Sequence, residues 1–190
     1  MARFTNEVSA RPEHLKMIRQ ARPLVNPEIE ESEIKDPEIS GAYQVYNVGL
    51  AELKTARVAL KAAPMLRVEE LGTARKISAA YELNTSARET EIPAVHTDAK
   101  YLARLNTGFE AAEKVARAST AAPKMRVINV PALHTEAYWL HYEDPGKDVV
   151  IPIHSFDFPE GVPVPYAVFM QKLSEAAKAV PDTSSNELGG

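Results

Sequence analysis

Hydrophobic residues follow two different periods along this chain, and these periods predict both helices and strands. The longest helical stripe has an apolar residue at every third or fourth position: Leu102, Leu105, Phe109, Ala112 and Ala116. It predicts a helix over residues 98–119, although the run 106–108 contains a glycine that could break it. Similar stripes predict a shorter helix over 50–60 and another over 166–180, where Pro181 stops it.

Residues 65–83 alternate between apolar and polar positions and predict a β-hairpin. The two-residue turn at 72–73 begins with glycine, which suits a type II′ turn. In that register Glu69 lies opposite Lys76, and a second pair of opposite charges lies next to the turn. Such cross-strand pairs contribute about 0.2–1 kcal/mol each, so we expect this register.

A second alternating region predicts three strands, over 124–131, 138–143 and 149–154. We expect Tyr138 to lie opposite Ile153, because this register gathers six apolar side chains on one face of the hairpin. Burial of each contributes about 1.5–3 kcal/mol, which outweighs the repulsion of Glu143 and Asp148, the two acids that this register places beside the exposed turn.

These elements predict an α+β fold, with an antiparallel sheet built from two hairpins (about 65–83 and 124–154) packed against three helices. Residues 1–40 contain four prolines and an acidic stretch, and we interpret them as an irregular arm over the domain or over a neighbouring subunit. Flexible disorder is the alternative for this arm. We expect one α+β domain over 41–181 and a flexible tail over 182–190.

Eight residues recur nearly unchanged, since Ile92–Ala99 returns as Val130–Ala137. We interpret the first copy as a cap before the long helix and the second as a corner between two strands. A different similarity links Ala62–Val68 to Ala121–Val127, and each of these segments follows a predicted helix and opens a predicted strand. Because the two repeats have different offsets, one duplication cannot explain both. The alternation of a helix with a hairpin is a stronger signal than either repeat, and it predicts a helix–hairpin unit that occurs twice.

Each copy of the eight-residue repeat places a histidine two residues before an acid: His96 before Asp98, and His134 before Glu136. Imidazole titrates near neutral pH, so two such corners could form an acid–base pair or hold a metal ion. This hypothesis requires both histidines to line one cleft. In the alternative, the neighbouring threonines cap or turn the chain, and the histidines lie at the surface.

The aromatic residues gather near the C-terminal end of the predicted sheet. Trp139, His141 and His154 fall on one predicted face, and Phe156 and Phe158 follow in a loop. Aromatic side chains are enriched at interfaces, so these five residues form a candidate binding face. The alternative is that they pack in the core.

The composition narrows the possible functions of this chain of 190 residues. It has 45% hydrophobic and 25% charged residues, as globular domains do, and it lacks cysteine, which excludes disulfides and thiolate metal sites. The net charge of −4 argues against a nucleic-acid partner, and no apolar run is long enough to span a membrane. The first residues lack the apolar core of a signal peptide, so we expect a cytoplasmic location.

Two hypotheses about function follow. The first is a binding or assembly module without catalysis that contacts a protein partner or a second copy through the N-terminal arm. It is favoured because the chain has no glycine-rich phosphate loop, no nucleophile elbow and no tight histidine motif for zinc, so no cofactor or metal is expected. The second is a metal-dependent or hydrolase-like enzyme that uses His96 and His134. The sequence does not indicate the ligand or the substrate of either.

Overall fold

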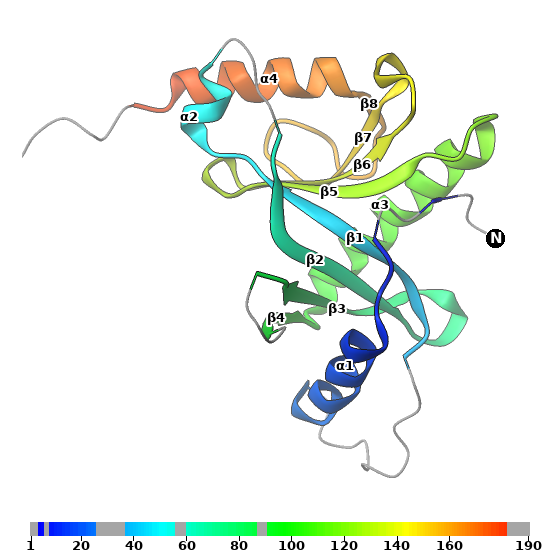
Figure 1. Cartoon of the computed structure of the whole chain (residues 1–190). Coiled ribbons are helices and arrows are strands. Elements are labelled where there is room, and N and C mark those ends of the chain that lie inside the picture. The colour runs from blue at the N-terminus through cyan, green and yellow to red at the C-terminus, as the bar shows by residue number, and fades with distance from the viewer. Residues whose placement is uncertain (1–3, 6–7, 26–36, 56–59, 87–90, 182–190) are drawn as a thin grey trace, which may run out of the picture.

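The computed structural model describes residues 4–5, 8–25, 37–55, 60–86 and 91–181. Within these ranges the chain forms one sheet of eight strands with helices on both faces (Figure 1). The α+β class expected from the sequence is therefore confirmed. The predicted tail and residues 1–3, 6–7 and 26–36 of the predicted arm lie outside the described residues. The prediction that the arm is irregular is wrong for residues 12–25, which form a helix whose Ile18 is completely buried against the sheet.

The α-helices are α1 (Pro12–Val25), α2 (Leu50–Leu53), α3 (Ala99–Ala118) and α4 (Tyr166–Ala179). The strands are β1 (Ile39–Asn47), β2 (Ala62–Leu71), β3 (Ile77–Asn84), β4 (Glu91–His96), β5 (Lys124–Val130), β6 (Thr135–His141), β7 (Val149–His154) and β8 (Val164–Pro165). Helices α3 and α4 lie where the apolar stripes predicted them. Helix α2 is shorter than its predicted pattern, of which residues 56–59 are outside the described part of the chain.

The sheet is mixed rather than wholly antiparallel. Its strand order is β4-β3-β2-β1-β5-β6-β7-β8, and every neighbouring pair is antiparallel except β1 and β5, which are parallel. The prediction missed this pair because parallel strands are joined by long crossovers and leave no turn signal in the sequence. The β1–β5 pair joins the two hairpin regions into one continuous sheet.

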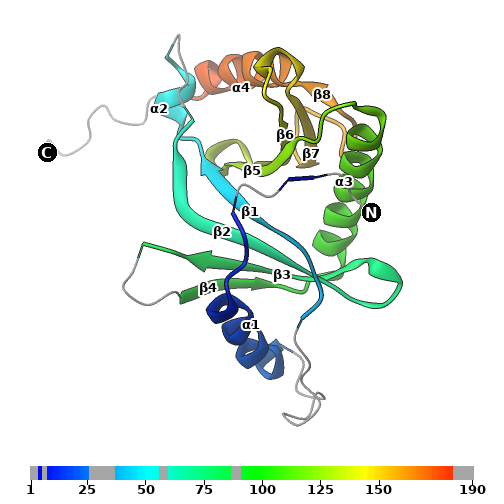
Figure 2. The same cartoon turned by 45° about the vertical axis from the view of Figure 1, so that its right-hand side comes forward.

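The sheet is strongly curved, as Figures 1 and 2 show. Arg67 of β2 and Glu136 of β6 approach to 2.6 Å although two strands separate them. In a flat sheet these strands would lie about 14 Å apart, so their concave face must fold toward itself. Helix α3 packs on this concave face, whereas α1 and α4 cover the opposite face over β1–β3 and β5–β7 respectively.

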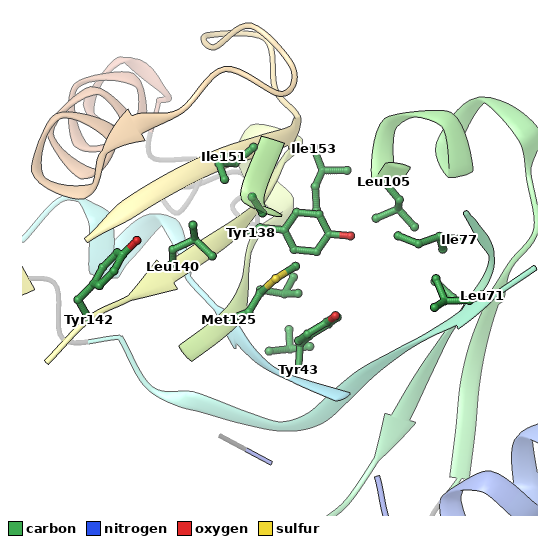
Figure 3. Packing of buried hydrophobic residues seen from close by; sticks show 14 residues of the cluster. Tyr43, Leu71, Ile77, Leu105, Met125, Tyr138, Leu140, Tyr142, Ile151 and Ile153 are labelled. Atoms are coloured by element: carbon green, nitrogen blue, oxygen red, sulfur yellow. The ribbon is translucent and has the colours of Figure 1, made fainter. Parts of the chain in front are cut away.

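The core on the concave face is built from alternate residues of the strands (Figure 3). Tyr43 of β1 and Tyr138 of β6 meet edge to face with their ring centroids 6.2 Å apart. Leu105 of α3 is completely buried against the sheet. This face includes all the apolar side chains that the second predicted hairpin placed together, so the prediction of the faces is confirmed.

Helix α3 continues through residues 106–108, where the sequence predicted a weak point. The side-chain amide of Asn106 bonds both the amide and the carbonyl group of Ile77, at 2.8 and 3.0 Å, and so acts as a strand partner for the start of β3. A Cβ atom on Gly108 would lie 3.1 Å from the ring of Tyr138. These small and polar residues allow close packing of the helix against the sheet.

The predicted register of the first hairpin is wrong. Glu69 lies opposite Ala80 instead of Lys76. The turn is longer than expected, since the 3₁₀ turn Thr73–Arg75 separates the strands and places Ala74 and Arg75 at φ values of 59° and 57°. The acids of β2 are buried and bond groups inside the fold, so they are not available to the basic residues of the turn.

The register of the second hairpin also differs from the prediction, since Tyr138 lies opposite Ile151 rather than Ile153. The shift is two residues, which leaves every side chain on its predicted face. Its cause is Asp148, which is buried and accepts hydrogen bonds at 2.8 Å from the Trp139 indole, the His141 ring and the Tyr142 amide. These donors fix the turn. Asp148 is therefore not the exposed acid that the prediction assumed.

The two copies of the eight-residue repeat adopt different conformations, as predicted. The first copy forms edge strand β4 and the start of α3, where Asp98 rather than Thr97 is the N-cap and accepts the amide hydrogen of Tyr101 at 2.9 Å. The second forms the 3₁₀ turn Pro131–Leu133 and then enters β6 after His134, which has a φ of 47°. The sequence did not reveal β4, because its proline is tolerated only at a sheet edge.

Candidate functional site

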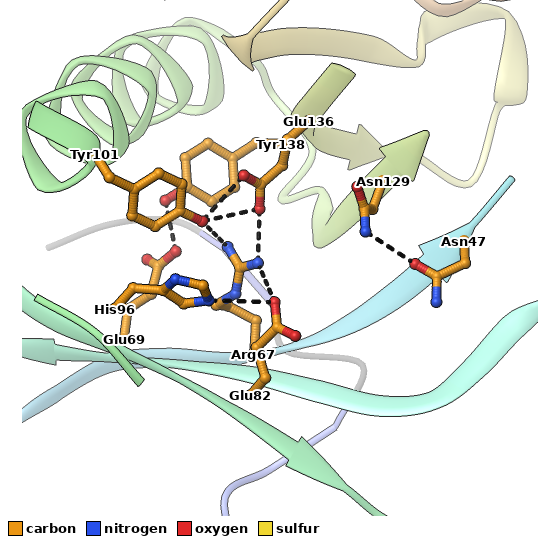
Figure 4. A network of polar contacts seen from close by, with 9 residues as sticks. All are labelled: Asn47, Arg67, Glu69, Glu82, His96, Tyr101, Asn129, Glu136 and Tyr138. Atoms are coloured by element: carbon orange, nitrogen blue, oxygen red, sulfur yellow. Dashed lines mark hydrogen bonds and ion pairs between the residues drawn. The ribbon is translucent and has the colours of Figure 1, made fainter. Parts of the chain in front are cut away.

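A group of polar side chains lies on the concave face, within the otherwise apolar core (Figure 4). We call it the polar band. Figure 4 shows Arg67, Glu69, Glu82, His96, Tyr101, Glu136 and Tyr138, and hydrogen bonds add Ser40 and Tyr43 to these members. Alternation along β2 turns Arg67 and Glu69 toward the same face as the buried side chain of Leu71. Charged residues are rarely buried unless they are paired, so each needs a partner inside the fold.

One end of the polar band is centred on the guanidinium group of Arg67, whose side chain is 3% exposed. Its Nη2 atom lies 2.7 Å from Glu82 Oε1 and 2.6 Å from Glu136 Oε1, and Nη1 donates to the hydroxyl group of Tyr101 at 2.9 Å. These contacts connect β2, β3, β6 and α3. The Arg67 end is therefore an ionic cross-link through the curved sheet.

The carboxyl group of Glu82 is strongly acidic in this environment. The imidazole of His96 and the guanidinium of Arg67 hold its pKa at about 2, against the opposite effect of burial. His96 Nε2 is 3.6 Å from Glu82 Oε1, which is longer than a normal hydrogen bond, whereas Arg67 is at 2.7 Å. We therefore assign the larger share of the effect to Arg67. Glu82 is ionised at neutral pH.

Tyr101 connects His96 to Glu136. Its hydroxyl group donates to the carboxylate of Glu136, with both oxygens at 3.0 Å, and its ring packs against the imidazole of His96 at a centroid distance of 4.9 Å. Burial is the main reason that the pKa of Tyr101 is raised above its ordinary value. The hydroxyl group therefore keeps its proton and remains a donor at physiological pH.

The other end of the polar band is the carboxyl group of Glu69, which is completely buried. It accepts hydrogen bonds from the hydroxyl groups of Tyr138 at 2.6 Å and Ser40 at 3.2 Å. Burial raises the pKa of Glu69 to about 7, and these hydroxyl donors and the more distant Arg67 offset only part of the effect. Glu69 is thus a buried acid that titrates near neutral pH.

A cleft of about 360 Å³ opens beside the Glu69 end, between the β2–β3 turn and α3. The partly buried Ser40 lines it, so this hydroxyl group connects the cleft to Glu69. Its apolar lining includes Ile39, Leu71 and Phe109, and its charged lining consists of Arg75, Lys76, Glu110, Glu113 and Arg117. Polar and charged groups thus make up most of this lining, beside an acid whose pKa is perturbed, and a perturbed acid at a cleft indicates a candidate ligand site.

The structure brings together only part of the predicted polar site. His96 and Glu136 both lie in the polar band and are linked by Tyr101. Asp98 caps α3, and the ring of His134 packs against Phe156, with centroids 5.7 Å apart. Among the described residues, no contact joins the rings of His96 and His134.

The predicted aromatic binding face is divided between separate places. Trp139 and His141 lie together, with centroids 5.1 Å apart, beside the buried Asp148. His154 instead packs against Phe156, which is 77% exposed.

Phe158 was expected to be part of that face, but it is buried. It packs against Phe169 of α4, with ring centroids 4.8 Å apart. Its loop crosses the apolar face of this helix and carries the ring into the core. Phe158 is therefore not available to a partner.

Sequence reasoning missed Arg67, Glu69, Glu82 and Tyr101, which hold the polar band together. The predicted hairpin register assigned the acids to exposed cross-strand pairs. The alternation along the strand could have indicated their burial, because Arg67 and Glu69 lie four and two residues before the buried Leu71 and therefore point to the same face. Their partners on β6 and α3 come from the curvature of the sheet, which no local pattern encodes.

Comparisons with protein-family models, curated proteins and solved structures found no match to this chain. Among the described residues, no group of three or more histidine and acidic side chains has an arrangement that could hold a metal ion. None of the described helices is long and apolar enough to cross a bilayer.

Proposed function

We propose that the protein is a binding module without catalysis and that its ligand occupies the cleft between the β2–β3 turn and α3. The observation that carries this proposal is the difference between the two ends of the polar band. At the Arg67 end the charged groups bond one another. At the Glu69 end, a cleft with apolar and charged lining lies one hydroxyl group away from a buried acid.

The alternative, a metal-dependent or hydrolase-like enzyme that uses His96 and His134, has less support. Such an enzyme needs both rings within reach of one substrate. Here His96 contacts Tyr101 while His134 contacts Phe156. Glu136, the acid of the second corner, bonds Arg67 and Tyr101.

A titration with anilinonaphthalene sulfonate, an aromatic anion, tests the proposed site. Binding is followed by backbone amide shifts of the full chain. We expect saturable shifts concentrated in residues 39–41, 71–76 and 106–117. Lys76→Glu should weaken binding, whereas Lys114→Glu, which makes the same charge change on an exposed α3 residue outside the cleft, should not. Shifts centred elsewhere, or no saturable binding, contradict the proposal.

A specific observation also favours an assembly role, since Phe156 exposes 77% of its surface next to the rings of His134 and His154. A large exposed aromatic side chain is characteristic of contact surfaces. We propose that two copies of the chain associate through this surface. The solution mass tests this proposal: the wild type should be a dimer and Phe156→Ser a monomer. A wild type that is monomeric at all concentrations contradicts self-association.

A further inference from the structure

We propose that the cleft binds a small organic anion and that the buried carboxyl group of Glu69 senses this anion through the hydroxyl group of Ser40. This inference rests on the proposed function, because it names the ligand class and the regulation of the same cleft.

Cationic side chains reach the cleft from both of its walls. Arg75 and Lys76 extend from the β2–β3 turn, and Arg117 extends from α3. Of the two acids in the lining, Glu113 is paired with Arg117 at 2.7 Å, and Arg75 lies 3.9 Å from Glu38 in a largely exposed pair. The described residues include no ion-pair partner for Lys76. The three cations of the lining outnumber its two acids, so the lining favours an anion, and the ring of Phe109 and the methyl groups of Ile39 and Leu71 suit an organic body.

The hydroxyl group of Ser40 occupies the position of a relay. Its Oγ atom lies 3.2 Å from Glu69 Oε2 and 3.0 Å from the hydroxyl group of Tyr43, and the residue lines the cleft. When Glu69 is ionised, Ser40 donates its proton to that carboxylate and turns its lone pairs toward the cleft. When Glu69 takes a proton from solvent, the hydroxyl group of Ser40 is released to donate to a bound anion.

The groups that face Glu69 come from several elements. Tyr138 of β6 and Ser40 donate to it, and Tyr43 of β1 lies beside it. Arg67 lowers its pKa and Glu136 raises it, and both act from the other end of the polar band. With burial outweighing these effects, the pKa is about 7, so the charge of Glu69 changes in the physiological range.

The sign of the coupling follows from these contacts. The negative charge of ionised Glu69 repels an anion in the cleft, and the reoriented hydroxyl group removes a donor. Anion binding should therefore be tighter below the pKa of Glu69 than above it. By reciprocity, a bound anion should raise the pKa of Glu69.

The wall that carries Arg75 is held in a strained conformation. Ala74 and Arg75 both have positive φ values, 59° and 57°, in a turn closed by hydrogen bonds between Gly72 and Lys76 at 2.8 Å and between Arg75 and Gly72 at 3.2 Å. Non-glycine residues rarely adopt this region and persist there only where the surrounding structure determines it. The turn thus fixes the backbone from which the exposed side chains of Arg75 and Lys76 extend.

The experiment measures the affinity of the full chain for anilinonaphthalene sulfonate, whose sulfonate stays ionised, at about pH 5.5 and about pH 8.5. We expect binding about fivefold weaker or more at the higher pH. Glu69→Gln should bind with the same affinity at both pH values, since it keeps an acceptor for Tyr138 but cannot ionise. Ser40→Ala should lose the part of the pH dependence that comes from the hydroxyl donor and keep the part that comes from charge repulsion, whereas Ser40→Thr, which keeps the hydroxyl group, should retain both.

A second measurement does not depend on any variant. Carbon NMR of the Glu69 carboxyl group gives its pKa in the wild-type chain with and without saturating probe, and we expect the probe to raise it. Equal affinity at both pH values with an unchanged Glu69 pKa overturns this inference but leaves the binding module intact. Tighter binding at the higher pH also overturns it. No saturable binding at either pH means that the proposed function itself has failed.

Discussion

Glu82 and Glu69 are two glutamates on the concave side of one curved sheet, yet their acidities move in opposite directions. The pKa of Glu82 is held at about 2 and that of Glu69 is raised to about 7. The two neighbouring strands β2 and β3 carry them, so the class of secondary structure does not explain the difference. The difference in pKa is explained by the partners of the two carboxyl groups.

Arg67 separates the two cases. Its guanidinium group contacts Glu82 and Glu136 directly, whereas the groups that donate to the Glu69 carboxylate in the described part of the chain are the hydroxyl groups of Tyr138 and Ser40. A hydroxyl donor satisfies a carboxylate without cancelling its charge, and so it cannot offset the full effect of burial. One cation can therefore produce a structural cross-link at one end of a polar band and leave a titratable group at the other.

Replacing Arg67 should have the largest effect, because it removes the cation and leaves Glu82 and Glu136 without their partner in the interior. We expect Arg67→Met to lower the free energy of unfolding by about 3–5 kcal/mol at neutral pH, measured by urea denaturation. The control is Arg104→Met, which breaks the more exposed pair with Glu160 and should cost less than about 1 kcal/mol. Equal losses in the two variants would show that Arg67 is not a cross-link.

Glu69→Gln tests the other end of the band through the pH dependence of stability. The folded pKa of Glu69 is above its unfolded value of about 4.5, so its ionisation destabilises the fold as pH rises from about 4.5 to about 7. Relative to the wild type, the variant should gain about 3 kcal/mol over this range. Unfolding curves between acidic and alkaline pH measure the gain. A constant difference would mean that Glu69 is not the titrating group.

Glu82→Gln should show the opposite behaviour. The folded pKa of Glu82 lies below its unfolded value, so its contribution is present above about pH 4.5 and is lost as pH falls toward about 2. We expect a loss of about 2 kcal/mol at neutral pH that disappears in acid, since the side chain is 19% exposed and solvent weakens the interaction. A loss that persists at acidic pH would indicate packing rather than charge.

Ala74→Gly is expected to have the smallest effect and concerns the turn beside the cleft. Glycine adopts the positive φ of this position without strain, so the variant should be more stable by about 0.5–1 kcal/mol in thermal unfolding. Ala103→Gly is the matched control in the exposed side of α3, where the same change should destabilise by about 1 kcal/mol. Destabilisation in both variants would contradict the strain at Ala74.

The sequence was informative where one periodic stripe decided the structure. The stripes over α3 and α4 predicted these helices nearly to their ends, and alternation in the second hairpin predicted which apolar side chains of β6 and β7 share one face. It was uninformative about register, because pairs such as Glu69 with Lys76 satisfy local rules that burial then overrides. The parallel pairing of β1 with β5 joins distant segments and leaves no local pattern.

The candidate site was predicted only in part for the same reason. His96 and Glu136 were identified because a repeated motif drew attention to them, and the structure places both in the polar band. Arg67 and Glu69 belong to no motif, and an exposed hairpin explained them equally well. Their importance comes from what curvature places opposite them, which is a property of the assembled sheet.

The packing of α3 has a consequence for how this chain acquires its structure. This helix follows the first hairpin in sequence, yet Gly108 fits closely against Tyr138 and Ile153 of the second hairpin. During synthesis, the concave face of β1 and β2 therefore stays uncovered until the strands of the second hairpin have emerged from the ribosome. We expect fragments of either half to be insoluble alone and to recover a native spectrum only when mixed, because each half supplies the missing interior of the other.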